Sequence, residues 1–196
     1  MRRARLLAVV ITVACGAIGV ISSTQTWLTA VLDDSVEHAL EVPGASAIPV
    51  LAPLSLAVLA LGAALSIVGL MLRYVFGALS VLIGLVLAWL SAQVAFARPV
   101  SAVASVVTES TGIAGESSVS DLVASITATP WPAITLAGWV VLVATGIFTV
   151  ATARGWTATG RRYRTEESVR SAPGGSRPHD AIDDWDDLSR GEDPTT

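Results

Sequence analysis

Residues 48–97 decide the fold of this chain, and they read IPVLAPLSLAVLALGAALSIVGLMLRYVFGALSVLIGLVLAWLSAQVAFA. Arg73 is the only charged residue in this stretch and divides it into two apolar segments, 48–72 and 74–97. A helix needs about 20 mostly apolar residues to cross the hydrocarbon of a bilayer. Both segments meet that length, and Arg73 falls where a tight turn between them is expected. The stretch therefore predicts a hairpin of two transmembrane helices.

Two further apolar segments, 6–23 and 131–153, predict a first and a fourth span. The composition agrees, with 53% apolar residues, 14% charged residues and a mean hydropathy of +0.66 over 196 residues. These values are typical of membrane proteins. We therefore predict an all-α membrane protein, a four-helix transmembrane bundle with a disordered cytoplasmic C-terminal tail that ends in a short helix. The expected parts are the transmembrane domain 1–153, with outer loops 24–47 and 98–130, and the tail 154–196.

The first span has an alternative interpretation as a secretory signal peptide, because a basic start precedes an apolar run. We favour an uncleaved anchor, since about 18 apolar residues exceed the usual core of a signal peptide. The segment also lacks a clean cleavage site with a sequence typical of a mature protein after it. A lipoprotein interpretation would use Cys15, but Thr12 stands where a bulky aliphatic residue is expected.

The basic residues, all twelve of them Arg, predict the orientation. Placing both termini and Arg73 in the cytoplasm leaves Arg98 as the only Arg outside, which satisfies the positive-inside rule. The protein is thus expected in the cytoplasmic membrane, in contact with the lipid bilayer. The residues expected to set topology and contact headgroups are Arg2, Arg3, Arg5, Arg154, Arg161, Arg162 and Arg164. Trp27 and Trp131 are predicted interface anchors at the outer boundary, and Trp156 at the inner one.

Small residues at four-residue spacing, Gly62 with Ser66 and Ser80 with Gly84 and Ala88, predict close helix packing. We expect this packing within the hairpin joined at Arg73, and a seam between two copies stays open as the alternative. The first outer loop is expected to be a solvated connection. In the second, residues 117–126 predict a capped short helix.

The tail, 154–196, has three predicted parts: a basic juxtamembrane segment, 154–164, a linker, 165–179, and an acidic helix motif, 180–195. Ile182, Trp185 and Leu188 would share one face of a helix too short to be stable alone. This pattern favours a recognition element that folds on binding a cytosolic protein, and a solubilising acidic tail is the alternative. The candidate docking residues are Ile182, Trp185, Leu188, Arg190 and Asp193.

Groups suited to catalysis are sparse. His38 and His179 fall on opposite sides of the membrane in the predicted topology, and the single Cys15 cannot form a cysteine cluster. We expect no enzyme activity, catalytic residue, metal, cofactor or nucleic-acid partner. Transport would need polar groups within the spans, and the candidates are Gln93, Thr12, Ser66, Ser80 and Thr145. The hydroxyls among them can bond to carbonyls of their own helix instead.

The chain resembles the actinobacterial tryptophan-biosynthesis-associated transmembrane proteins, a family encoded with tryptophan operons. The matching residues are Arg2-Arg3, Trp27 with Thr29 and Ala30, Ala52-Pro53-Leu54, Thr129-Pro130-Trp131-Pro132, Arg161-Arg162-Tyr163 and the terminal stretch from Asp184 to Thr195. The Trp-x-x-Leu-x-x-Gly-x-Asp-Pro-Thr arrangement at the end is the most specific of these. The resemblance implies a link to tryptophan synthesis and brings no catalytic residue or cofactor.

Two functions follow as hypotheses. In the first, the protein is a membrane scaffold or adaptor whose C-terminal motif docks a soluble partner. In the second, it transports or senses tryptophan, indole or a precursor, with Trp27 and Trp131 near an outer mouth. We favour the adaptor because Trp27 and Trp131 are already explained as interface anchors, whereas Trp185 in a polar tail is not.

Overall fold

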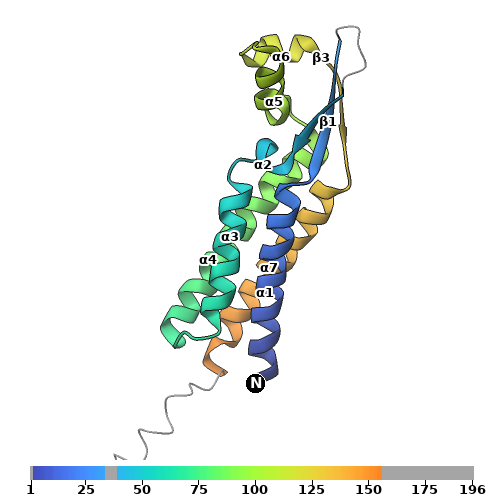
Figure 1. Ribbon diagram of the computed structural model, residues 1–196. Coiled ribbons are helices and arrows are strands. Elements are labelled where there is room, and N and C mark those ends of the chain that lie inside the picture. Colours follow the sequence, from blue (N-terminus) through green and yellow to red (C-terminus); the bar gives the residue numbers. More distant parts are fainter. Residues whose placement is uncertain (1, 34–38, 156–196) are drawn as a thin grey trace, which may run out of the picture. The chain divides into compact units, whose positions relative to one another are not determined.

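Four helices form the apolar part of the computed structural model, which describes residues 2–33 and 39–155 (Figure 1). They are α1 (Arg2–Ser23), α3 (Leu51–Leu65), α4 (Leu70–Ala92) and α7 (Trp131–Thr152). A π-helical turn, η1 (Gln93–Ala97), extends α4, and a 3-10 turn, η2 (Ala153–Gly155), follows α7. Three helical stretches are long and apolar enough to cross a membrane, namely Arg3–Ser23, Leu70–Ala97 and Trp131–Thr152.

The second predicted span, 48–72, differs from the prediction. Its helix, α3, has 15 residues, and at about 1.5 Å per residue it covers roughly 22 Å, less than the hydrocarbon thickness. Gly69 has an extended backbone (φ −74°, ψ −179°), so the chain reverses between Ser66 and Gly69. The predicted turn at Arg73 is therefore wrong, because Arg73 lies in the first turn of α4. Glycine loses more conformational freedom in a helix than other residues do, which favours the break at Gly69.

The helices pack in an order that the chain order does not suggest: α3 lies on α1, α1 on α7, and α7 on α4. Gly62 of α3 faces Val13 of α1, and Gly84 of α4 faces Val143 of α7. These small residues pack inside the molecule, but not across the α3–α4 hairpin as predicted. Close approach at glycine explains why the α1–α3 and α4–α7 pairs form. The two hairpin helices contact each other much less.

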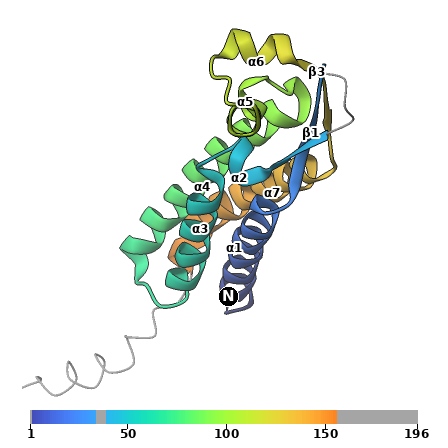
Figure 2. The ribbon, with the colours of Figure 1, turned by 45° about the horizontal axis from the view of Figure 1, so that its top comes forward.

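A three-stranded antiparallel sheet, in the order β2-β1-β3, lies at one end of the helices (Figures 1 and 2). Its strands are β1 (Thr26–Leu32), β2 (Ala39–Pro43) and β3 (Val123–Ala128). Short helices α2 (Gly44–Ala47), α5 (Ser101–Thr111) and α6 (Glu116–Leu122) accompany it. We call residues 24–33, 39–50 and 98–130 the cap, and the two ends of the helices the cap end and the tail end. The all-α prediction is corrected to a mostly helical fold with a small sheet.

The cap is packed rather than solvated. Trp27, Leu28, Ala30 and Val42 have no exposed surface, which corrects the prediction that the first loop is a solvated connection. The predicted helix 117–126 ends at Leu122, and the chain then joins the sheet, where Thr127 pairs with Thr29. One apolar cluster runs from Val58 and Leu142 in the helices to Val103 and others in the cap. The cap and the helices therefore share a core.

Candidate functional site

Many hydroxyl groups of the helices bond to carbonyls of their own helix, whereas the buried Ser91 hydroxyl of α4 has no partner among the described residues. The side chains of Thr12, Ser66, Ser80 and Thr145 each donate to a carbonyl three or four residues earlier, at 2.6–2.8 Å. This confirms the expectation that they satisfy themselves on the preceding turn. Of the predicted polar candidates, Gln93 alone has a side chain without such a bond among the described residues.

Gln93 begins the π-helical turn at the cap end of α4. The Arg98 amide donates to the Gln93 carbonyl at 3.1 Å, five residues back, and Arg98 then adopts a left-handed backbone (φ 46°, ψ 55°). Pro99 follows and cannot continue the helix. Helical turns of this type and left-handed non-glycine residues gather at functional sites, because their strain must be stabilised by surrounding structure.

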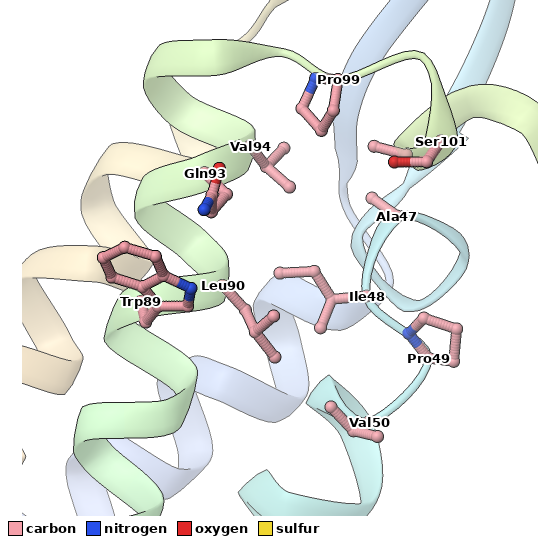
Figure 3. Close-up of a pocket in the computed structure, with 11 residues that line it drawn as sticks. Ala47, Ile48, Pro49, Val50, Trp89, Leu90, Gln93, Val94, Pro99 and Ser101 are labelled. Carbon is pink, nitrogen blue, oxygen red and sulfur yellow. The ribbon is translucent and has the colours of Figure 1, made fainter.

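A pocket of about 540 Å³ lies beside this turn, a volume in the range of small-molecule sites. Figure 3 shows one wall from α4 and η1, an opposite wall from the segment before α3, and a third side from the start of α5. The lining residues are Ala47, Ile48, Pro49, Val50, Trp89, Leu90, Gln93, Val94, Pro99, Ser101 and Ala102. Because α3 begins only at Leu51, the non-helical residues before it face the last turns of α4. The short α3 thus leaves room for the pocket.

The lining is apolar except for the indole N–H of Trp89 and two further side chains. Gln93 and Ser101 supply an amide and a hydroxyl on different walls (Figure 3), and neither side chain bonds to another described residue. None of the lining residues is ionisable. Within residues 2–33 and 39–155, no group of three or more His, Cys, Asp or Glu is placed to hold a metal ion. The pocket therefore offers shape, aromatic surface and three neutral hydrogen-bonding groups.

Sequence reasoning named Gln93 but missed the rest of this pocket. Its walls come from segments around residues 48, 90 and 100, which are far apart in the chain. Trp89 is 67% exposed on the rim, and the sequence alone placed it only within an apolar span. A glutamine in an otherwise apolar helix was the one local signal.

Trp27 lies in the protein interior, which corrects its prediction as an interface anchor. Its indole Nε1 donates to the Ser22 carbonyl and lies equally close, at 2.9 Å, to the Ser22 hydroxyl. That hydroxyl is 2.5 Å from Thr135 Oγ1 in α7. The indole therefore joins the first strand of the cap to α1 and α7. Trp131 is half-buried against the same core, and Trp156 falls outside the described residues.

Arginines gather at the tail end. Arg73 is 2% exposed and donates through Nη1 to the Ala153 carbonyl at 3.1 Å and through Nη2 to the Val68 carbonyl at 3.3 Å. Arg5 donates to the Ser66 carbonyl. These cations bind carbonyls where α3 and α7 end, the position that the helix dipole favours. Arg3 and Arg154 are exposed near the beginning of α1 and the end of α7.

Arg73→Met should lower the free energy of unfolding by about 2 kcal/mol, because it removes charged donors from two carbonyls and keeps an apolar stem. Cys15 is the only cysteine and is 4% exposed, so its labelling by a thiol-reactive dye on heating reports unfolding. Arg98→Met, at an exposed arginine, is the matched control. Equal melting temperatures for Arg73→Met and Arg98→Met would contradict a structural role for Arg73.

The remaining predicted site residues are not placed. The docking candidates Ile182, Trp185, Leu188, Arg190 and Asp193 lie outside the described residues, as do Arg161, Arg162 and Arg164. Arg2 is the first residue of α1. The assignment of the tail as a docking element stays a prediction.

The comparison with known families decides the membership of the chain. The profile of a family described as tryptophan-associated transmembrane protein matches residues 9–195. The chain belongs to this family. Membership confirms the resemblance and establishes a transmembrane protein associated with tryptophan, whereas the actinobacterial origin stays a prediction. No curated protein and no solved structure matches the chain.

Proposed function

We propose that this family member is a non-catalytic membrane scaffold or adaptor of tryptophan synthesis, with a cytoplasmic tail that docks a soluble partner. The observation that supports this role best is the way the described helices pack. Most of their glycines meet neighbouring helices, and the hydroxyls of Thr12, Ser80 and Thr145 bond within their own helices. Such helices are suited to anchoring, since few polar groups are left to line a pathway.

The start of the tail also supports the proposal. Arg73 binds the carbonyl of Ala153, two residues before the described part of the chain ends at Gly155. The tail therefore leaves the membrane domain from a held position. A motif carried there would be presented at the membrane surface, where Ile182, Trp185 and Leu188 supply an apolar face for a partner.

The alternative, transport or sensing of tryptophan, indole or a precursor, loses one of its candidate residues. Trp27 was expected near an outer mouth, but it has no exposed surface. The pocket at Gln93 is open at the cap end, and it favours reception of a small molecule over passage through the helices.

The adaptor proposal predicts that truncation after Arg170 abolishes the link to the partner. Crosslinking in native membranes should capture a soluble protein with the intact chain, and Trp185→Ala should lose most of that capture. A buried interface tryptophan contributes about 2 kcal/mol or more, which corresponds to at least tenfold in affinity. Trp156→Ala is the matched control, since it changes a tail tryptophan outside the motif. Equal capture by the intact chain and Trp185→Ala would remove Trp185 as the anchor.

A further inference from the structure

The pocket beside Gln93 carries an inference that goes beyond the adaptor function and does not depend on the tail. Its position follows from two irregularities, the late start of α3 at Leu51 and the π-helical turn that ends α4. Non-helical backbone at membrane depth is tolerated where it lines a cavity or is buried in protein. The segment Ile48–Val50 meets this condition, because all three of its residues line the pocket.

The depth of the pocket follows from the length of α4. Arg73 lies near one end of this helix, and 20 residues further along, about 30 Å at 1.5 Å per residue, the chain reaches Gln93. Trp89, one turn before Gln93, is 67% exposed, as expected for an aromatic residue at a membrane boundary. The pocket therefore lies near the boundary between hydrocarbon and headgroups at the cap end. Molecules dissolved in that layer can reach it past Trp89 and Val50, which is 44% exposed.

The lining selects the kind of molecule. The indole of Trp89 offers a flat surface, and the saturated rings of Pro49 and Pro99 offer apolar ones; Figure 3 shows all three around the same space as Leu90 and Ile48. Flat apolar surfaces suit an aromatic ring, which stacks on tryptophan at favourable distances. The Gln93 amide and the Ser101 hydroxyl can bond to a polar atom of that ring. A lipid acyl chain has no polar atom to bond to the Gln93 amide or the Ser101 hydroxyl.

The absence of ionisable groups from the eleven lining residues sets the charge of the ligand. A carboxylate or ammonium held in the pocket would lose water without gaining a countercharge, which is costly. We propose that this pocket binds a small, uncharged aromatic molecule with one hydrogen-bonding group. Indole is the simplest probe of this class, because it has a single N–H donor. Free tryptophan carries both charges and should bind much less well.

The test uses the full-length protein in nanodiscs and radiolabelled indole, with empty nanodiscs of the same lipid to subtract partitioning. We expect a saturable component of one indole per chain. Gln93→Leu keeps the size of the side chain and removes the amide, so the affinity should fall roughly 3- to 10-fold. Ser101→Trp should abolish saturable binding by filling the pocket. Ser105→Trp is the matched control, since Ser105 is exposed on the same helix and does not line the pocket.

Three results would overturn the proposal. The first is uptake of indole by the protein that equals uptake by empty nanodiscs, or indole binding by Gln93→Leu and Ser101→Trp that equals binding by the wild type. The second is displacement of indole by free tryptophan at equal concentration, which would reject the uncharged class. The third is a phospholipid retained in the pocket that excess indole does not displace. The temperature at which Cys15 becomes labelled shows whether Ser101→Trp folds. If this variant does not fold, the indole affinity of Gln93→Leu decides whether the pocket binds indole.

Discussion

Trp27→Ala is expected to lower the free energy of unfolding by about 3–5 kcal/mol, the largest effect of any single substitution considered for this protein. The side chain has no exposed surface, so its removal leaves a large cavity between the cap and the helices. The ring also packs against Gly44 of α2, where an added Cβ would lie 2.7 Å from the indole nitrogen. Labelling of Cys15 during heating should show melting well below that of the wild type.

Two further variants separate the causes. Trp27→Phe keeps most of the ring and removes the N–H that donates to the Ser22 carbonyl. We expect a smaller loss than for Trp27→Ala, about 1–3 kcal/mol, because one buried hydrogen bond is lost and the missing five-membered ring leaves a small cavity. Trp89→Ala truncates an exposed tryptophan and should change the stability by less than about 1 kcal/mol. If Trp27→Ala melted like Trp89→Ala, the ring would not join the cap to the helices.

Gly19→Ala should cost about 3 kcal/mol, because a single methyl group has no space where three helices meet. A Cβ at Gly19 in α1 would overlap the Ser55 hydroxyl of α3 and approach Cη2 of Trp139 in α7 to 2.5 Å. Both neighbours are buried and rigidly held, so the helices themselves would have to move apart. The midpoint of Cys15 labelling on heating again measures the effect.

Gly138→Ala in α7 is the matched control for this prediction. A Cβ there would meet only the Ile18 side chain, at 3.9 Å, which is ordinary van der Waals contact. Alanine favours a helix over glycine by up to about 1 kcal/mol, so this variant should equal or exceed the wild type in stability. A loss of stability in Gly138→Ala as large as in Gly19→Ala would show that the close approach at Gly19 is not what matters.

The turn between α3 and α4 shows where sequence reasoning loses accuracy. Arg73 is the only charge between two apolar segments, and charges usually mark the ends of spans. The chain instead reverses at Gly69, and Arg73 is buried in the next helix with carbonyls of Ala153 and Val68 as acceptors. One of these acceptors, Ala153, lies in η2 just after α7, so no local pattern could have revealed it.

The sheet shows the same limit more strongly. Residues 123–126 were predicted as the end of a capped helix, but Val123–Ala128 forms β3 because β1, almost 100 residues earlier, offers a strand edge. The same limit applies to the candidate site. Gln93 could be recognised from the sequence as an amide in an apolar span, whereas the other residues that line the pocket could not. The walls of the pocket depend on how far α3 and α4 extend, which is a property of packing.

The sequence by itself determined that this protein has membrane-spanning helices, roughly where three of them run, and that the candidate hydroxyls Thr12, Ser66, Ser80 and Thr145 can bond within their own helices. These properties depend on local composition, because partition into lipid and bonding to a preceding turn involve neighbours along the chain. The tertiary structure alone decided which helices pair, that the loops form a cap with a sheet, that Trp27 is interior, and that a pocket lies beside Gln93. Each of these depends on contacts between distant segments, whose strength depends on shape complementarity that no local pattern encodes.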